Sequence, residues 1–269
     1  MKKMIIIAWL SIFVLGCQQE TPDTTSKEDK NAGNEHLLMA TAWYQKSAEQ
    51  AACYYQAFNL ATMALEKQLH TDSSEKPNAI VLDIDETLLD NSPFQVKMIQ
   101  TGKHYSHEFW KQWTDRAEAA ALPGGIEFLT FAHNNSIDIF YISNRMENEL
   151  QSTITNMENL GFPETRSDHF LLKSTTSDKK ERRKQITQNY DVLLYVGDNL
   201  GDFSNQWDNR GKDLGKNKMA DMKDILGTEF IILPNPMYGG WVDALQEQSG
   251  IDDYQEFIDH LPSQLDTWE

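Results

Sequence analysis

The sequence predicts an α/β fold, a doubly wound parallel sheet with a long N-terminal helical segment and a small cap. Four apolar runs have the length of buried strands: 79–82, 137–142, 192–196 and 230–233. Helical patterns lie between them, over 125–133, 147–160 and 178–190. Strands that alternate with helices in this way indicate a parallel sheet covered on both faces. We therefore expect the core at about 78–235, and the segment 94–122, which departs from the alternation, is the candidate for the cap.

The first residues of the chain have the pattern of an export signal. Two lysines precede an apolar run over residues 4–15, which is shorter than the roughly 20 residues that a transmembrane helix needs. The string VLGC, which ends at Cys17, resembles the lipobox of bacterial lipoproteins. This resemblance implies that residues 1–16 are a lipoprotein signal peptide and that Cys17 carries the lipid. An ordinary secretory signal with an incidental cysteine is the alternative.

The lipobox implies a location outside the cytoplasm, with the chain anchored by lipid to a bacterial membrane. Gln18 occupies the position where an aspartate commonly retains lipoproteins at an inner membrane. In an organism with two membranes we therefore expect the outer membrane. Residues 17–36 are rich in Thr, Asp, Glu, Lys, Ser and Asn, and this composition predicts a flexible tether before a domain at 37–269.

The domain begins with a helical pattern over 36–69, which contains no Pro or Gly. It predicts one long helix or a broken pair of helices. The chain has 2 cysteines, which allow one disulfide at most and exclude a four-cysteine zinc site. If Cys17 is lipidated, Cys53 is unpaired, and we expect it to be a small buried side chain.

Composition excludes some classes of partner. The 41 Asp and Glu residues exceed the 24 Lys and Arg residues and give a net charge of −17. Binding to nucleic-acid polymers or to anionic lipid headgroups depends on clustered basic residues, so we expect neither. At 40% hydrophobic residues the chain can bury a core. Composition does not predict the oligomeric state.

Polar side chains follow three of the predicted strands, and those of interest are Asp83, Asp85, Ser143, Asn144, Asp198 and Asp202. The carboxyl ends of parallel strands meet at one edge of a sheet, which is where ligands bind in such folds. Carboxylates that converge there repel one another unless a cation lies among them. Oxygen-only ligands of this kind suit Mg²⁺. The sequence therefore predicts a magnesium site at this edge.

Each of these motifs alone has a simpler interpretation. A single Asp-x-Asp or Gly-Asp-Asn is commonly turn chemistry or a helix cap. Neither aspartate stretch is a calcium loop, because Leu88 and Phe203 stand where such a loop needs glycine. The three motifs occur in order on three successive strand ends, which makes chance a poor explanation.

The motifs resemble those of the haloacid dehalogenase (HAD) superfamily. Asp83 begins a string like the first motif, and Ser143 matches the hydroxyl of the second. Lys173 matches the lysine of the third motif, and Asp198 with Asp202 matches the acidic fourth. Five longer strings narrow the resemblance: DIDETLLDNSPF, LPGGIEFL, YISNR, LLYVGDNLGDF and LPNPMYGGW.

These strings resemble the class C nonspecific acid phosphatases, in particular the surface-lipoprotein 5′-nucleotidase type. The resemblance extends from about Trp43 to Trp241 and implies a HAD-like domain that hydrolyses phosphate monoesters. One departure is Gly201, where these proteins often carry a further aspartate, although Asp202 beside it still supplies the motif.

The resemblance implies a role for each motif residue. Asp83 would be the nucleophile that forms an aspartyl-phosphate, and Asp85 would protonate the leaving oxygen and then deprotonate the hydrolytic water. Ser143, Asn144 and Lys173 would bind the phosphoryl oxygens. The leaving group of a phosphate ester needs a proton and a halide does not, so Asp85 favours a phosphatase over a dehalogenase.

The resemblance also implies the metal ligands. Mg²⁺ would be held by the Asp83 carboxylate, the main-chain carbonyl of Asp85 and the Asp198 carboxylate. Asp202 would orient water in the metal's coordination shell.

The substrate is the least determined part of the hypothesis. In the resembling nucleotidases an aromatic pair stacks on the base, and by motif position that pair is Trp110 and Tyr238. This favours nucleoside monophosphates as the small-molecule substrates. Two alternatives stay open: a broad-specificity acid phosphatase without base preference, and a surface lipoprotein that binds a ligand without catalysis.

Overall fold

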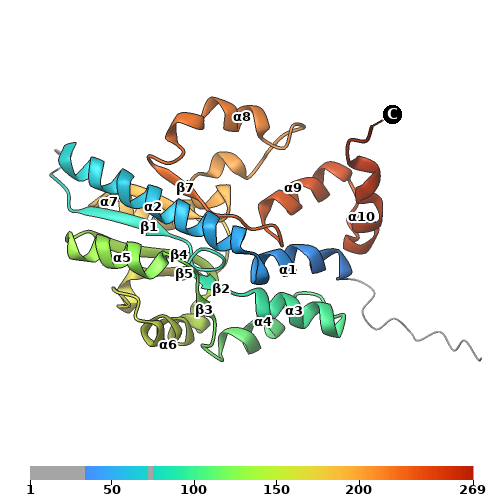
Figure 1. The fold of residues 1–269 in the computed structure, drawn as a ribbon, viewed down its shortest axis with the longest axis horizontal. Helices are drawn as coiled ribbons and strands as arrows, with labels where there is room; N and C mark the ends of the chain where they lie inside the picture. Colours follow the sequence, from blue (N-terminus) through green and yellow to red (C-terminus); the bar gives the residue numbers. More distant parts are fainter. Residues whose placement is uncertain (1–33, 72–74, 269) are drawn as a thin grey trace, which may run out of the picture. The chain divides into compact units, whose positions relative to one another are not determined.

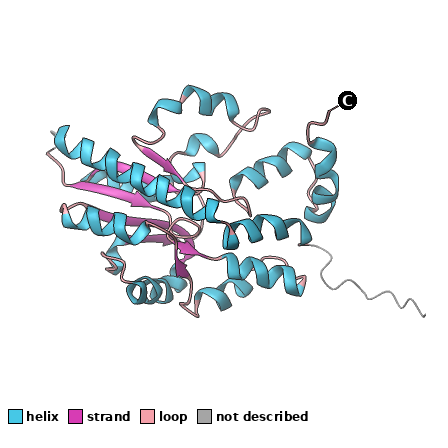
Figure 2. Ribbon diagram, in the orientation of Figure 1, coloured by secondary structure: helices cyan, strands magenta, loops and turns pink. Residues whose placement is uncertain are grey.

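Five parallel strands form the central sheet (Figure 1, Figure 2). The structure, a computed structural model, describes residues 34–71 and 75–268. The strands are β1 (Asn78–Leu82), β4 (Asp138–Met146), β5 (Phe170–Lys173), β6 (Asp191–Gly197) and β7 (Phe230–Ile232), in the order β5-β4-β1-β6-β7. The chain leaves β1 for β4 and β5 on one side and returns to β6 and β7 on the other. The predicted doubly wound parallel sheet is confirmed.

Two strands differ from the prediction. β5 was not predicted, because its four residues lack an uninterrupted apolar run of sufficient length. β4 continues four residues beyond the predicted run and ends at Met146, with an irregularity in its register to β5 between Ile142 and Met146. Residues 143–145, which the sequence places after the strand, therefore belong to its end.

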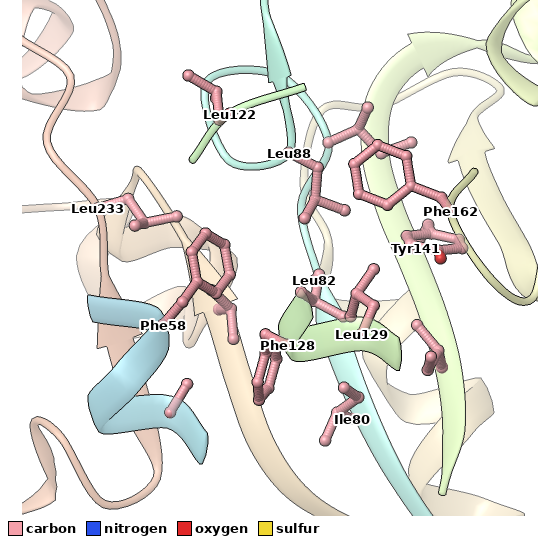
Figure 3. Close-up of a cluster of buried hydrophobic side chains, with 14 of the residues drawn as sticks. Phe58, Ile80, Leu82, Leu88, Leu122, Phe128, Leu129, Tyr141, Phe162 and Leu233 are labelled. Carbon is pink, nitrogen blue, oxygen red and sulfur yellow. The ribbon is translucent and has the colours of Figure 1, made fainter. Parts of the chain in front are cut away.

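Helices cover both faces of the sheet. α2 (Ala48–Thr71), α5 (Gly125–Asn134) and α6 (Leu150–Leu160) pack on one face, and α7 (Lys180–Asn189) packs on the other. Alternate residues of β1 serve the two faces, since Ile80 and Leu82 join the large cluster and Ala79 and Val81 the cluster under α7. Figure 3 shows the large cluster, in which Phe58 of α2 lies beside Phe128 of α5.

The N-terminal helical segment is a broken pair, α1 (Leu38–Lys46) and α2. The break falls at Ser47, which is extended and whose Oγ accepts the Gln50 N–H at 3.1 Å, as a helix N-cap does. The expectation for Cys53 is wrong, because its side chain is exposed. The buried stripe of α2 includes Tyr54 and Phe58, and Cys53 lies one residue, or about 100° of helical turn, away from it.

The chain between β1 and α5 forms a small insert. It contains the antiparallel pair β2 (Leu89–Asp90) and β3 (Ala120–Ala121), and between them α3 (Ser92–Thr101) and α4 (His107–Thr114). Its residues Phe94, Met98 and Trp110 form a separate buried cluster with Leu37, which precedes α1. The role of this insert as a cap over a substrate stays a prediction.

The C-terminal part contains α8 (Lys216–Asp221), α9 (Gly240–Ser249) and α10 (Tyr254–His260). Short 3-10 helices complete the elements: Glu35–Leu37, Glu147–Glu149, Ser167–His169, Leu200–Asp202, Asn205–Trp207, Lys223–Ile225 and Leu261–Gln264. Among the described helices none is long and apolar enough to cross a membrane. The predicted signal peptide, Cys17 and residues 18–33 of the tether lie outside the described residues.

Candidate active site

Three carboxylates meet where β1 and β6 end. The two strands pair in parallel, with Leu82 beside Val196, and the Asp83 N–H continues the ladder to the Val196 carbonyl at 3.0 Å. This pairing brings Asp83 to the loop that carries Asp198 and Asp202. One carboxylate oxygen from each aspartate lies within 4.8 Å of the others. We call this group the acidic cluster.

Asp202 fits into the acidic cluster because residue 197 is glycine. A Cβ at Gly197 would lie 2.2 Å from the Asp202 carboxylate, which is closer than any side chain allows. The Asn199 N–H donates to Asp202 at 3.0 Å and fixes its orientation. Asp198 accepts a hydrogen bond at 2.8 Å from the side-chain amide of Asn235, a residue that the sequence interpretation missed.

A buried lysine lies against the acidic cluster. The Nζ of Lys179, at the start of α7, is 2.5 Å from Asp83 and 2.6 Å from Asp202. The sequence interpretation gave this place to Lys173, whose Nζ instead donates to Ser177 at 2.9 Å. The reason is topological, because Lys173 ends the edge strand β5, which is separated from β1 by β4. The lysine that contacts the acidic cluster is therefore Lys179 and not Lys173.

The acidic cluster carries more negative charge than Lys179 can neutralise. Burial raises the pKa of Asp83 to about 7 against the opposing effect of Lys179, and Asp202 and Asp85 raise it further. Burial together with Asp202 and Asp83 raises the pKa of Asp198 well above its usual range. One ammonium faces three carboxylates. The donor set, all oxygen and in excess of negative charge, fits a hard divalent cation.

Asp85 lies in different surroundings, although it is two residues from Asp83. The guanidinium of Arg145 donates to its Oδ1 from Nε at 2.9 Å and from Nη2 at 2.8 Å. Asn91 donates to the same oxygen at 2.8 Å, and Ser143 donates to Oδ2 at 3.3 Å. We call Arg145, Asn91 and Ser143 the Asp85 clamp. Arg145 could have been noticed in the sequence as a charged residue directly after Ser143 and Asn144, but the sequence interpretation assigned no role to it.

Ser143 and Asn144 point in different directions, as successive residues of a strand do. Ser143 is fully buried, and its Oγ also accepts the Arg145 N–H at 3.1 Å. Asn144 is exposed, and its side-chain oxygen accepts from Arg182 of α7 at 2.8 Å. Arg182 also donates to the Ser143 carbonyl at 2.6 Å, so α7 supports the end of β4. Ser143 is placed beside Asp85, and Asn144 is held by α7.

The loop between Asp85 and β2 is supported from α2. Glu86 adopts a left-handed backbone conformation with φ 55°, which non-glycine residues rarely do. Its carbonyl accepts a hydrogen bond from the Tyr54 hydroxyl, and its carboxylate accepts the Asn91 N–H at 2.8 Å. Burial raises the pKa of Glu86 well above its usual range. These contacts hold the loop that follows both motif aspartates.

The two aromatic candidates lie on different elements. Trp110 of α4 packs edge-on against Phe94 with ring centroids 5.1 Å apart, and the Arg145 guanidinium is 5.8 Å from its ring centroid. Tyr238 is half-buried, packs against the large cluster and directs its N–H toward Asn235. Among the described residues no ring contact joins Trp110 to Tyr238. Trp113 contacts the large cluster, and its indole N–H donates to Asn91 at 2.8 Å.

Comparisons with known proteins identify the family of this chain. The chain matches the family model for the HAD superfamily, subfamily IIIB (Acid phosphatase), over residues 17–241. It resembles two crystal structures of the class C acid phosphatase from Bacillus anthracis, one of them with tungstate bound. Each is 40% identical, with a TM-score of 0.82, and the match covers 88% of this chain and 99% of the other.

A more distant relative is acid phosphatase 1 of Solanum lycopersicum, which is 26% identical over 169 residues. That match covers 59% of this chain and 57% of the tomato protein, so the chain spans little more than half of that curated relative. The family match covers most of the chain and includes the acidic cluster, the Asp85 clamp and Lys179. The chain belongs to subfamily IIIB of the HAD superfamily, the acid phosphatases.

Proposed function

We propose that this chain hydrolyses phosphate monoesters with Mg²⁺ and that Asp83 is its nucleophile. The observation that carries the proposal is the position of Asp83, which lies in the acidic cluster and contacts Lys179. The family match supports the reaction class. The tungstate bound to the Bacillus anthracis protein supports it too, because tungstate is a tetrahedral oxyanion like phosphate.

In the first step a carboxylate oxygen of Asp83 forms a bond to phosphorus while the bond to the ester oxygen breaks. The leaving oxygen takes a proton from Asp85. In the second step water attacks the aspartyl-phosphate, Asp85 takes a proton from this water, and the carboxylate of Asp83 is regenerated with release of inorganic phosphate. The Asp85 clamp fixes the carboxyl group that carries this proton in both steps.

The residues that would hold Mg²⁺ are Asp83, Asp198 and Asp202, with the main-chain carbonyl of Asp85 as the further ligand that the family motif implies. When bound, Mg²⁺ neutralises the carboxylates and the phosphoryl group and so lowers the repulsion between them. Lys179 and Ser143 would bind phosphoryl oxygens from two sides. We assign to Lys179 the role that the sequence interpretation gave to Lys173.

Nucleoside monophosphates are the proposed substrates, with Trp110 and Tyr238 contacting the base. The Trp110 ring lies beside Arg145, which belongs to the Asp85 clamp. The competing hypothesis is a broad-specificity acid phosphatase without base preference. Comparing kcat/KM for AMP, nicotinamide mononucleotide and p-nitrophenyl phosphate at pH 5 to 7 distinguishes them, since only a base-binding site favours the two nucleotides.

We also propose that Cys17 is lipidated and that the protein acts outside the cytoplasm on a bacterial membrane, the outer one where there are two. The VLGC string supports this proposal. Metabolic labelling with a palmitate analogue should label the wild type and not Cys17→Ser, whereas labelling of both would contradict it.

Phosphate release by the purified protein tests the proposed activity. Release from p-nitrophenyl phosphate should require Mg²⁺ and stop with EDTA. Asp83→Asn should lower kcat by about 10⁴-fold or more, because a carboxamide cannot form the covalent intermediate. Near-normal rates in Asp83→Asn would disprove the mechanism. No release from a dozen phosphomonoesters with Mg²⁺ present would favour the non-catalytic binding role.

A further inference from the structure

A second concave site lies beside the acidic cluster. It is a cavity of about 360 Å³, within the range of small-molecule pockets, between the loop after β6, α8, β7 and the start of α9. It shares Asp198 with the acidic cluster and extends away from the Asp85 clamp. Neither Trp110 nor Tyr238 lines it. The mechanism proposed above uses none of its residues except Asp198.

One wall of this cavity is apolar. Its side chains come from the loop after β6, from α8, from β7 and from α9, and they are Leu200, Met219, Leu226, Ile232, Leu233 and Trp241. Ile232 and Trp241 are each 40% exposed. Large apolar groups at the rim of a cavity are available to contact the body of a ligand.

The lining of this cavity also carries a positive charge. Arg210 lines the cavity, and its Nη2 lies 3.5 Å from the side-chain oxygen of Asn199. In residues 34–71 and 75–268 no carboxylate lies within ion-pair distance of this guanidinium. Asp243 of α9 acts on it from farther away, and burial lowers the pKa of Arg210. A half-buried arginine without an adjacent carboxylate is suited to receive an anion.

The backbone at the start of α9 lies close to Arg210. A Cβ at Gly240 would meet Nη2 of Arg210 at 3.1 Å and the Asn199 amide at 3.1 and 3.2 Å. Gly240 is the first residue of α9, and in its first turn the N–H groups of Val242 and Asp243 donate to the Gly239 carbonyl at 2.8 and 3.4 Å. Arg210 and the Asn199 amide therefore pack closely against the start of α9.

From the position of Arg210 in this largely apolar cavity, we propose that the cavity binds a small organic anion, an apolar or aromatic body that carries one carboxylate or phosphate group. The anionic group contacts the guanidinium of Arg210. The body contacts Ile232 and Trp241. Binding there changes catalysis from outside the phosphate site, because Asn235 and Asp198 border the cavity and Asp198 belongs to the acidic cluster.

Calorimetric titration of the full chain with 2-naphthoate tests the binding directly and needs no activity. The control ligand is 2-naphthamide, which has the same body without the charge. We expect 2-naphthoate to bind more tightly than 2-naphthamide by about tenfold or more, the effect of one charge-assisted contact. Equal affinity for the two ligands, or binding of neither, would overturn the proposal.

Variants locate the bound anion. Arg210→Gln should raise the Kd of 2-naphthoate by about tenfold or more and leave that of 2-naphthamide within twofold. Arg116→Gln is the matched control, because Arg116 is exposed and pairs only with Glu118 at the surface, and it should change neither. Gly240→Ala, which places a methyl group against Arg210, should also weaken the binding of 2-naphthoate. Unchanged binding in both Arg210→Gln and Gly240→Ala would contradict this location.

Inhibition kinetics distinguish this cavity from the phosphate site. With p-nitrophenyl phosphate as substrate, 2-naphthoate should change kcat and leave KM within twofold, and Arg210→Gln should remove this effect. The proposed ligand carries either a carboxylate or a phosphate group. A second titration therefore uses 1-naphthyl phosphonate, which resembles a phosphate ester but is not hydrolysed. Purely competitive inhibition by 2-naphthoate that persists in Arg210→Gln would place it in the phosphate site and overturn the proposal.

Discussion

Asp83 and Asp85 belong to one five-residue motif, yet the acidic cluster and the Asp85 clamp treat a carboxylate in opposite ways. Asp83 lies among like charges with one lysine, and its pKa is raised to about 7. Asp85 accepts hydrogen bonds from the Arg145 guanidinium and from the side chains of Asn91 and Ser143. The comparison teaches that the clamp is complete within the protein, whereas the acidic cluster is incomplete without an added cation.

Among the predictions that test this difference, the largest expected effect is on kcat and comes from substitution of a lysine. Lys179→Met should lower kcat for p-nitrophenyl phosphate by about 10²–10³-fold, since it removes the positive group that contacts Asp83 and that we propose binds the phosphoryl group. Lys173→Met is the matched control and should stay within about twofold, because its ammonium contacts Ser177. Steady-state kinetics in Mg²⁺ measure both. A larger loss in Lys173→Met would restore the original assignment.

Removing one charge from each region should change stability in opposite directions. In the metal-free protein, Asp85→Asn should cost about 3 kcal/mol, because it leaves the buried guanidinium of Arg145 without its carboxylate. Asp83→Asn should leave the free energy of unfolding unchanged or raise it, because it relieves repulsion while Lys179 keeps Asp202. Denaturant unfolding at pH 8 in EDTA measures both. Equal destabilisation would show that the two regions do not differ as described.

The pH dependence of folding stability is a further test of the difference between the two regions. Asp83 has a folded pKa of about 7, above its ordinary 3.8, so folding disfavours its ionised form. This penalty is absent below about pH 4, grows as the pH rises toward 7 and is constant above. The metal-free protein should therefore lose stability over that window, and Mg²⁺ should raise Tm more at pH 8 than at pH 5. The stability of Asp83→Asn should depend less on pH than that of the wild type. If Mg²⁺ raised the Tm of the wild type equally at pH 5 and pH 8, ionisation of Asp83 would not be the cause.

The smallest effect concerns the aromatic ring beside the Asp85 clamp. Trp110→Ala should raise KM for AMP by about tenfold, since one base–aromatic stack contributes roughly 1–3 kcal/mol. KM for p-nitrophenyl phosphate should change less, because it offers no base. Phe109→Ala on the same helix is the control for general loss of packing. An unchanged KM for AMP in Trp110→Ala would remove base stacking from the proposal.

The sequence predicted the sheet, and it predicted which strand ends carry polar residues, because both follow from hydrophobic periodicity and strand polarity. It did not predict that Lys179, and not Lys173, contacts Asp83, since that depends on the strand order, which places β5 at the edge. The Asp85 clamp also escaped prediction. Arg145 and Asn91 reach Asp85 across 60 and 6 positions, and pairing over such distances is set by packing rather than by local pattern.

The contact between Tyr54 and Glu86 has a consequence for protein engineering. Tyr54 lies on α2, near the N-terminal side of the domain, and its hydroxyl supports the loop that begins with Asp83 and Asp85. Any shortened version of the protein therefore has to retain α1 and α2 in full. For the same reason, fusion partners belong upstream of α1, because a junction inside α2 would alter the geometry of the catalytic loop.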